Sequence, residues 1–583
     1  MKKNIFLSLL LVVLITLTWW SWTRLNLSTK GPTLIRLAID QSIDSLDPAK
    51  AFSDDSLLIS SQVLESLYQY HYLKRPYEIE PLLAESKPTI EDQGKLYRIK
   101  LKCGSEYHPH PAFKATKRKL KAEDFVNQFK RLSLDSLNSP GRSLFSGLII
   151  GFDEYAKKIE NDWRKIPSHQ LEGFQAIDDC SLRIKLTKPE PNLIYYLALN
   201  FIVPIPWEII EFNKNKLDQT LIGTGPYQYL GFNTEYYELR KFKGYRKDFY
   251  PSSGDRYANV ENLLDSSKEQ IPFIDAVRFY VSLQENERWE KFMNHELDIL
   301  SVPKTFITKL YDKNGDLSPE LKSNDIILKH FPILASRWLA FNMKDPILGK
   351  NAFLRRAIAF GINYSEYMRV ISQNTNLRAN SILVPGISGY QPAKDFRFKY
   401  DPQLAKDYLK MGGFTEQSKM PEIIYSTRGN QGINLLEANF IKEQLETIGL
   451  KVKIQVLNFS EFLKKGRAGE LMFFTDNWLL DYPDAENILQ LLISQNSPGI
   501  NKSAYKNEKI DQLYFTLKST TNQDLKDKIV KEMEDILFEE LPWIPMMYES
   551  SFVIQYPEIK NFRKSSIIRN YIKYLKIENL KWN

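Results

Sequence analysis

The sequence predicts an α/β protein with more than one domain, and three observations support that fold class. The chain has 583 residues, which is more than a single hydrophobic core ordinarily serves. Strand-like and helix-like segments alternate along it. Residues 421–427, 432–449 and 451–458 have the apolar spacing of a strand, a helix and a second strand, which is the pattern of a β-α-β unit.

The chain begins with a segment typical of exported proteins. Residues 5–22 are uncharged and rich in Leu, Ile and Val, and they follow Lys2 and Lys3. Eighteen such residues are just long enough to span a bilayer, and the tryptophans at their end suit its interface. We therefore predict that residues 1–32 are a signal peptide or an anchor in the inner membrane, with the body of the protein outside the cytoplasm. No cysteine follows that could carry a lipid.

The first part of the body is predicted to alternate short strands with helices. Strands are expected at residues 34–40, 237–242 and 275–282, and an amphipathic helix is expected at 56–70. Residues 245–273 are rich in Ser, Asp, Gly and Pro, so an inserted surface loop is expected there.

The only two cysteines lie beside two further strand-like segments. Cys103 ends "YRIKLKC" (97–103), and Cys180 begins "CSLRIKL" (180–186). If these strands pair antiparallel, the two cysteines come close enough for a disulfide, which an exported protein can keep. Two buried free thiols are the alternative, and the sequence leaves both open.

The second half of the chain continues the α/β pattern. Strands are predicted at 336–343 and 470–478, and helices at 352–371, 507–519 and 525–540. A second and a third domain are therefore expected.

Motifs for nucleic-acid binding, catalysis and metal binding are missing. The net charge is +8, and the densest basic run, 114–124, is best explained as a solvated loop. Neither G-x-S-x-G nor H-E-x-x-H occurs, and "GTGPYQY" (223–229) lacks the third glycine of a dinucleotide loop. The six histidines are scattered, and Pro109 separates the single close pair. We therefore expect no catalytic residues, no metal, no cofactor and no nucleic-acid partner.

One stretch combines acidic and aromatic residues where a strand meets a loop. It is "NWLLDYPDAEN" (477–487), and its carboxylates are Asp481, Asp484 and Glu486. The stretch lacks the spacing and the glycine of a calcium loop. It also has no accompanying base or nucleophile for acid catalysis. A third interpretation is that one carboxylate binds the ammonium group of a ligand beside Trp478 and Tyr482. Capping of the next helix accounts for Asp484 and Glu486 but not for Asp481.

Six segments in order resemble the extracytoplasmic solute-binding proteins of peptide ABC transporters, the oligopeptide- and dipeptide-binding group of family 5. They are 42–56, with "SLDP"; 97–108 together with 120–132; 223–232; 339–363; 476–492; and 541–550. The resemblance covers essentially the whole chain after residue 33.

The resemblance implies a two-lobed periplasmic-binding-protein fold with a third domain and with the ligand cleft between the lobes. The expected first lobe consists of residues 33–58, 203–333 and 547–583. An inserted domain, 59–202, interrupts the first lobe, and the second lobe is 334–546.

The family resemblance also implies a non-enzymatic function. A monomeric periplasmic receptor would bind an oligopeptide between its lobes and deliver it to an ABC permease in the inner membrane. In this family an aspartate of a W-x-x-D segment pairs with the peptide's N-terminal amine, and Asp481 stands at that position. Trp478 matches the tryptophan beside the ligand. The backbone groups of Asn477 and Leu479 match those that pair with the peptide. Ile43 matches another position of this kind, but the match is weaker.

Three departures from the family pattern leave alternatives open. Asn477 replaces the usual glycine, the lipid-modified cysteine is missing, and insertion 245–273 is long enough to touch a partner or to shield the cleft. The same fold could bind a non-peptide solute, such as an oligosaccharide, a nickel complex or an opine-like amine. An exported hydrolase that uses Asp481 and Asp484 as an acid pair is the alternative from another class.

Overall fold

The structure is a computed structural model that describes most of the chain between residues 32 and 578. The described ranges are 32–39, 43–114, 117–281, 284–391, 395–415, 420–429, 432–497 and 499–578. The predicted export segment, 5–22, lies outside them. Among the helices within these ranges, none combines the length and the apolar character that a bilayer span requires.

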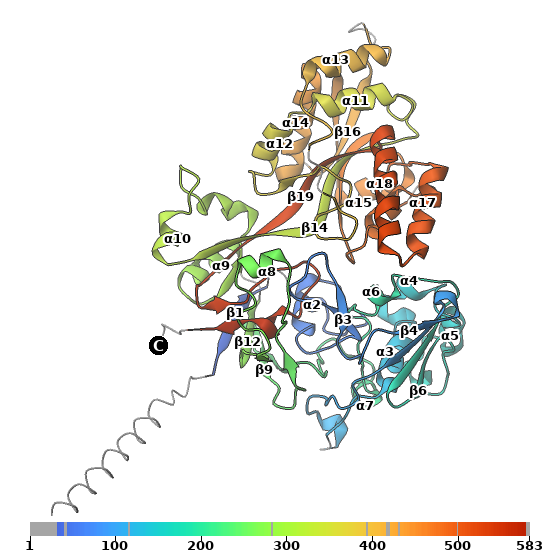
Figure 1. The fold of residues 1–583 in the computed structure, drawn as a ribbon, viewed down its shortest axis with the longest axis vertical. Coiled ribbons are helices and arrows are strands. Elements are labelled where there is room, and N and C mark those ends of the chain that lie inside the picture. Colours follow the sequence, from blue (N-terminus) through green and yellow to red (C-terminus); the bar gives the residue numbers. More distant parts are fainter. Residues whose placement is uncertain are drawn as a thin grey trace, which may run out of the picture.

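Two α/β lobes make up the molecule, and two long strands run from one lobe to the other (Figure 1). These strands are β14 (Ile327–Phe341) and β19 (Trp543–Gln555), and they pair antiparallel. Their register shifts between Pro332 and Ser336, where the pair passes between the lobes. Such irregularities bend a strand pair, so this point is suited to a change of angle between the lobes. The predicted two-lobed α/β fold is confirmed, while its exact domain boundaries remain a prediction.

The first lobe contains one end of a mixed sheet that continues into the second lobe. Strand β1 pairs parallel with β12, and β12 pairs antiparallel with β9. The strands at this end are β1 (Leu34–Ala38), β8 (Tyr227–Phe232), β9 (Tyr236–Lys241), β12 (Ala276–Tyr280) and β13 (Ile299–Ser301). The three strands predicted in this region are therefore present. Its helices include α2 (Asp54–Ser60), α9 (Glu285–Met293) and α10 (Pro319–Ser323).

The second lobe contains the predicted β-α-β unit. Strands β16 (Glu422–Arg428) and β17 (Lys451–Leu457) pair parallel, and helix α14 (Gly432–Thr447) connects them. The sheet continues through β18 (Phe473–Leu479) to β14. The remaining helices include α11 (Ala352–Gly361), α12 (Tyr364–Ile371), α13 (Pro402–Met411), α15 (Phe459–Ala468), α16 (Glu486–Leu489), α17 (Glu508–Ser519) and α18 (Gln523–Glu540).

Two helix predictions were wrong in extent. The helix expected at 56–70 ends at Ser60, because the backbone oxygens of Gln62 and Val63 bond instead to the amides of Tyr227 and Gly225. The helix expected at 352–371 is divided into α11 and α12. There the side chain of Asn363 accepts a hydrogen bond from the Glu366 amide and starts a new helix.

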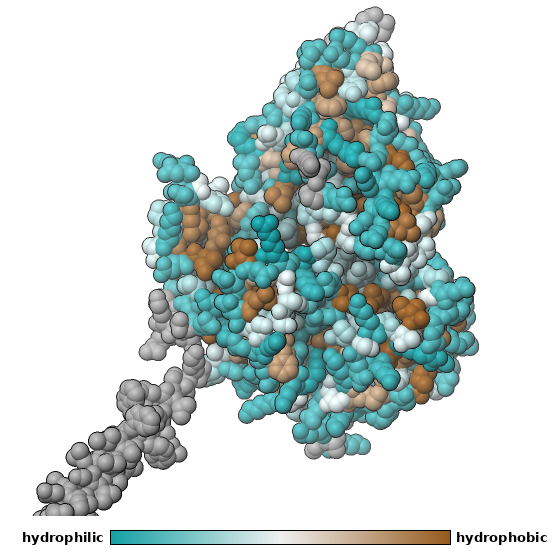
Figure 2. All heavy atoms as spheres, viewed as in Figure 1, coloured by the Kyte–Doolittle hydropathy of each residue, from teal (hydrophilic) through white to brown (hydrophobic). Residues whose placement is uncertain are grey.

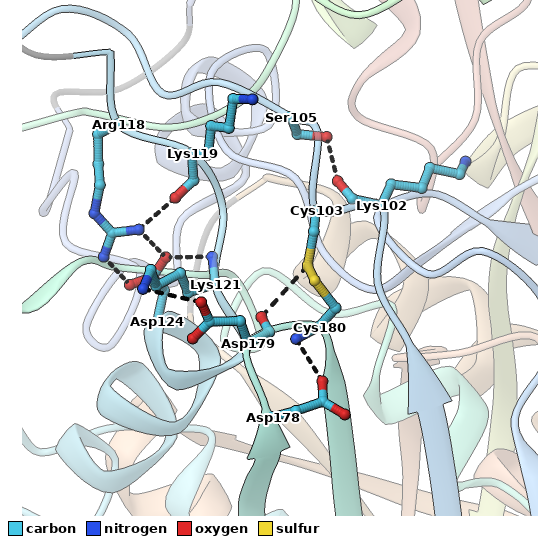
Figure 3. Close-up of a disulfide and its surroundings, with 10 residues drawn as sticks. All are labelled: Lys102, Cys103, Ser105, Arg118, Lys119, Lys121, Asp124, Asp178, Asp179 and Cys180. Carbon is cyan, nitrogen blue, oxygen red and sulfur yellow. Dashed lines mark hydrogen bonds and ion pairs between the residues drawn. A yellow bond between two sulfur atoms is a disulfide. The ribbon is translucent and has the colours of Figure 1, made fainter.

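The inserted domain contains a separate antiparallel sheet. Its strands, in spatial order, are β4 (Thr89–Glu91), β5 (Leu96–Lys100), β7 (Ser181–Lys185) and β6 (Phe174–Asp178). Strands β5 and β7 pair antiparallel, with Lys100 opposite Ser181. Just beyond that end, Cys103 and Cys180 form a disulfide with their Cα atoms 5.7 Å apart (Figure 3).

The disulfide should contribute to the stability of the inserted domain. It links residues 77 apart in sequence, so it restricts the unfolded chain strongly. We expect the double variant Cys103→Ser, Cys180→Ser to lose about 2–4 kcal/mol of unfolding free energy. Denaturant unfolding would measure this loss, and a reducing agent should reproduce it in the wild-type protein. Equal stability of the two proteins would contradict the prediction.

A buried ion pair joins the "SLDP" loop to helix α3 (Ala122–Arg131). Arg131 and Asp47 are both fully buried, and the Arg131 Nη1–Asp47 Oδ1 distance is 2.9 Å. A second bond joins Arg131 Nη2 to Asp47 Oδ2, and the guanidinium also donates to Gln128 and Asn215, each at 2.7 Å. Asp47 therefore has a structural role between the first lobe and the inserted domain.

Removal of the Arg131 charge is expected to destabilise this junction. The Arg131→Met variant leaves the Asp47 carboxylate buried without its partner, which costs about 3–5 kcal/mol of unfolding free energy. The exposed pair Arg164–Asp162 offers a control, because Arg164→Met should change that free energy little. Chemical denaturation of the two variants measures the difference, and similar losses in both would contradict the prediction.

Residues 245–273 are not the plain surface loop that was expected. They contain β10 (Asp248–Phe249), α8 (Arg256–Val260) and β11 (Gln270–Ile271). Four of their apolar side chains are buried in a cluster with the C-terminal segment: Tyr250, Ala258, Leu263 and Ile271. Ion pairs Asp255–Arg563 at 2.7 Å and Glu269–Lys576 at 2.9 Å join the same two segments. No local sequence pattern predicts this packing, because the partner residues lie about 300 positions away in the chain.

Candidate ligand site

Strand β18 ends at the boundary between the lobes and carries three of the predicted ligand residues. Opposite it on β14, Asn477 faces Arg337, Trp478 faces Ser336 and Leu479 faces Ala335. Asn477 and Trp478 are half-buried, and Leu479 is exposed. This strand end lies beside the irregular part of β14.

One edge of β18 is open near its end. On the side of β16, pairing reaches only Phe473 and Phe474. In the described part of the chain, no other strand pairs with that side from Asn477 to Leu479. Backbone groups that point to this side are therefore available to an extended ligand.

Asp481 follows the strand and is exposed to solvent. Its backbone amide donates a hydrogen bond of 3.2 Å to Asn487 Oδ1, and its carboxylate accepts one of 3.3 Å from Asn487 Nδ2. The indole Nε1 of Trp478 donates to the same Asn487 oxygen at 2.9 Å. The structure thus brings Asp481 and Trp478 together through a residue that the sequence analysis did not single out.

The environment of Asp481 disfavours its charge. Loss of solvation raises the pKa of Asp481 above its usual value, and the negative charge of Glu486 adds to that rise. The hydrogen bond from Asn487 opposes it. Although the side chain reaches solvent, the surrounding protein removes enough water to weaken its hydration. A ligand ammonium group would restore the lost stabilisation of the carboxylate.

A pocket of about 110 Å³ lies beside Asp481. Its remaining lining comes from residues within 57–70, 198–201 and 567–570, together with Leu82. That volume holds several water molecules or a small ligand group. Of the pocket residues that the structure describes, Asp481 is the one from the second lobe, so the pocket lies on the side of the first lobe and its inserted domain.

Two polar side chains of this pocket stand out. The Tyr70 hydroxyl is buried and has no hydrogen-bond partner within the described ranges. The Arg569 guanidinium pairs with Asp54 at 2.5 Å. No short sequence pattern marks either residue, because they come from opposite ends of the chain.

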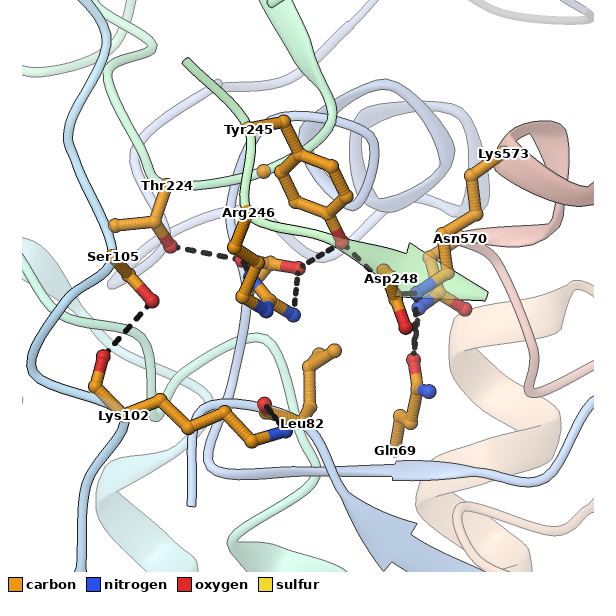
Figure 4. A network of polar contacts seen from close by, with 12 residues as sticks. Gln69, Leu82, Lys102, Ser105, Thr224, Tyr245, Arg246, Asp248, Asn570 and Lys573 are labelled. Atoms are coloured by element: carbon orange, nitrogen blue, oxygen red, sulfur yellow. Dashed lines mark hydrogen bonds and ion pairs between the residues drawn. The ribbon is translucent and has the colours of Figure 1, made fainter. Parts of the chain in front are cut away.

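A polar network supports the pocket from behind (Figure 4). Gln69, which lines the pocket, accepts hydrogen bonds from Asn570 at 2.9 Å and from Lys573 at 3.2 Å. Lys573 also reaches Asp248 at 3.3 Å. Tyr245 donates to the same Asp248 at 3.1 Å, so insertion 245–273 braces the pocket wall.

Arg428 is a second charged group near the predicted ligand row. It ends β16, and its Nη2 donates a hydrogen bond of 2.9 Å to Asn477 Oδ1. The guanidinium also lies over the ring of Phe462. It has no carboxylate partner within the described part of the chain.

Ile43, the residue with the weaker match to a ligand position of the family, lies in the first lobe. Its side chain is half-buried and packs against the first-lobe core, and it is not among the residues that line the pocket. A ligand contact of Ile43 remains a prediction.

Asp484 and Glu486 are more than loop and helix-start residues. Asp484 does accept a hydrogen bond from the Glu486 amide at 2.9 Å, as a helix start requires. However, Asp484 is buried and pairs with Lys526 at 2.9 Å, so it is not free to act with Asp481 as an acid pair. This geometry speaks against the hydrolase alternative.

Glu486 is the centre of a contact between the lobes. Within the second lobe it accepts hydrogen bonds from the hydroxyls of Tyr482 and Tyr514 and pairs with Lys518 at 3.2 Å. From the inserted domain, Asn192 Nδ2 donates to it at 3.4 Å. Lys518 also reaches Glu190 of the inserted domain at 3.5 Å.

Aromatic rings extend this contact. Tyr195, on α6 (Leu193–Tyr196), stacks on Tyr482 with ring centroids 5.8 Å apart, and Tyr196 meets Tyr482 edge-on at 5.5 Å. In Figure 2, apolar residues are visible at the level of α6, where the inserted domain faces the second lobe. The lobes therefore touch beside the loop that carries Asp481.

Comparison with known protein families matches most of the chain. Residues 78–499 match the family model described as "Bacterial extracellular solute-binding proteins, family 5 Middle". The di/tripeptide-binding protein 2 of Pseudomonas aeruginosa is 24% identical over 555 residues, covering 94% of this chain and 95% of that protein. The dipeptide-binding protein of Escherichia coli is 22% identical, covering 86% of each chain. Heme-binding protein A of Haemophilus influenzae is 24% identical, covering 87% and 85%.

Solved structures share the fold. The DppA protein of Helicobacter pylori in complex with the peptide STSA has a TM-score of 0.66 and 22% identity, covering 94% of this chain and 98% of that one. HbpA2 of Haemophilus parasuis has a TM-score of 0.75 and 19% identity, covering 94% and 100%.

Proposed function

Because the chain belongs to the bacterial extracellular solute-binding proteins of family 5, we propose that it is the peptide-binding receptor of an ABC importer. The open edge of β18, which leads directly into Asp481, is the observation that carries this proposal. A peptide added to that edge would bond through its main chain, so affinity would depend little on its side chains. Its N-terminal ammonium would then meet the Asp481 carboxylate.

The other end of the peptide has a candidate partner in Arg428. This guanidinium is half-buried beside Asn477 and has no carboxylate partner in the described part of the chain. Asn477 and Asp481 are four residues apart, a separation of at most about 14 Å in an extended chain. A carboxylate at Arg428 and an amine at Asp481 would therefore suit a short peptide of a few residues.

The same family supports a proposal for the cellular setting. We propose a monomer outside the cytoplasm that delivers peptide to an inner-membrane permease, with residues 5–22 as its export signal or anchor. Closure of the lobes on the ligand would distinguish the loaded from the empty receptor.

The relatives also leave room for other ligands. Related proteins of similar identity are named for binding heme and glutathione. A ligand without an amine would leave Asp481 unpaired in a closed cleft, which is costly. Asp481 therefore favours a solute with an amine over an oligosaccharide or a metal complex.

Mass spectrometry of ligands that co-purify with residues 33–583 tests the function. We expect short peptides with free amines, and calorimetry with the synthetic peptides should give saturable binding. A sugar, a heme or a metal complex as the only bound solute, with no affinity for peptides, would overturn the proposal.

A further inference from the structure

The side-chain amide of Asn487 connects the two residues proposed to hold the ligand. Only 1% of Asn487 is exposed. Its Oδ1 accepts hydrogen bonds from Trp478 Nε1 at 2.9 Å and from the Asp481 amide at 3.2 Å. Its Nδ2 donates to Asp481 Oδ2 at 3.3 Å. One side chain thus holds the indole of Trp478 together with both the backbone amide and the carboxylate of Asp481.

This set of bonds fits the chemistry of asparagine closely. An indole nitrogen can only donate, so the oxygen of the amide must face Trp478 and the nitrogen must face the carboxylate. Aspartate in place of Asn487 would keep the acceptor but lose the donor. Glutamine has the same groups on a longer chain, which would displace Trp478 or Asp481.

Asn487 itself is held rigidly. Its backbone amide donates to the Asp484 oxygen at 3.1 Å, and its backbone oxygen accepts from Gln490 Nε2 at 2.9 Å. Its neighbour Glu486 is buried in the contact between the lobes. The amide therefore presents its groups from a fixed position.

We propose that Asn487 is a positioning residue that sets the direction and the charge of Asp481 for the ligand amine; this rests on the proposed function. Its donor bond stabilises the charged carboxylate. Among the described residues, the negative charge of Glu486, on the same helical turn as Asn487, acts on this carboxylate, and Arg569 lines the same pocket. Without the amide, Asp481 would rotate freely and would hold its proton at higher pH.

The Asn487→Ala variant tests the proposal against Asn501→Ala. Asn501 is another buried asparagine of the second lobe, and it bonds to the backbone of Ile493 and Tyr505 rather than to Asp481. Both variants should melt at a lower temperature than the wild type. Only Asn487→Ala should weaken binding of a free-amine peptide, by about 10- to 100-fold.

The Asn487→Asp variant separates positioning from folding. It keeps the acceptor for Trp478, so the indole resonance of Trp478 in 15N-tryptophan-labelled protein should stay close to its wild-type position. In Asn487→Ala that resonance should move, and Trp478→Phe identifies it. In Asn487→Ala the pH below which peptide binding weakens should rise, because the donor to Asp481 is lost. In Asn487→Asp it should rise further, because a second carboxylate then faces Asp481.

Three results would each overturn the positioning role of Asn487. Unchanged affinity and an unchanged pH profile in Asn487→Ala, with a wild type that binds peptide, would overturn the positioning role alone. A wild type that binds no free-amine peptide would overturn the proposed function, and this inference with it. Equal losses of affinity in Asn487→Ala and Asn501→Ala would show a general effect of folding and would also overturn it.

Discussion

The Asp481→Asn variant is expected to bind a free-amine peptide about 30-fold to several thousand-fold more weakly than the wild-type protein. The substitution keeps the shape of the side chain and removes its charge. A peptide ammonium enclosed beside Trp478 would then lie in the closed cleft without its counter-charge, which is the costly part of the change. Isothermal calorimetry on a peptide found in the purified protein measures the difference.

An N-acetylated version of the same peptide is the matched control. It lacks the ammonium group, so the wild-type protein should lose a comparable part of its affinity. The Asp481→Asn variant should distinguish little between the two peptides, which makes the four measurements a double-mutant cycle. Equal affinity of wild type and variant for the free-amine peptide would refute the anchor.

The pH dependence of binding offers a second measure of the same carboxylate. Loss of solvation raises the pKa of Asp481 in the unliganded protein. An ammonium ligand prefers the charged carboxylate, so binding releases a proton wherever Asp481 is protonated. Affinity should therefore fall as the pH decreases through this raised pKa, at a higher pH than an ordinary aspartate would give. The Asp481→Asn variant should lack that step.

Local patterns in the sequence were sufficient for most of the fold. The β-α-β unit at residues 422–457 followed from apolar spacing alone, because each of its elements buries one face in the same lobe. The helix expected at 56–70 failed after Ser60, where hydrogen bonds to residues 225–227 replace those of a helix. Such competition comes from a segment more than about 160 residues away, so no local pattern contains it.

For the candidate site too, the sequence predicted only the residues that lie close together in the chain. Asp481 and Trp478 were found because they lie in one short stretch with a family resemblance. Tyr70 and Arg569 line the same pocket from distant parts of the chain, and only the tertiary structure brings them together. Glu486 was underestimated because its partners are distant in sequence: Tyr514 and Lys518 lie elsewhere in the second lobe, and Asn192 lies in the inserted domain.

The contact between the lobes leads to the other large expected effect. Lys518 lies between two buried carboxylates, Glu486 at 3.2 Å and Glu190 at 3.5 Å. Burial opposes the charge of Lys518, but Glu486 and Glu190 outweigh it and raise the pKa of this lysine. Burial raises the pKa of Glu190, and Glu486 adds to the rise. Lys518 is thus the cation that lets the two carboxylates come together.

Taking the contact of Lys518 with Glu486 and Glu190 as part of the closed form, we expect the Lys518→Met variant to resist closure of the lobes. In it, Glu190 and Glu486 would meet in a buried place without a cation, at a cost of about 3 kcal/mol for the closed form. In an open form, Glu190 would be hydrated and most of that cost would disappear. Peptide affinity should fall by about 100-fold, and small-angle X-ray scattering should show a larger radius of gyration at saturating peptide than in the wild type.

Two further variants identify the cause of that loss. Lys502 pairs with Asp476 at 2.7 Å inside the second lobe, so Lys502→Met should reduce stability without changing closure. Adding Glu190→Gln to Lys518→Met removes one of the two facing charges and should recover a large part of the lost affinity. If the double variant binds no better than Lys518→Met, the two carboxylates do not oppose each other in the closed form. The contact would then stabilise the second lobe alone, and closure would have to depend on the ligand and the tyrosine rings.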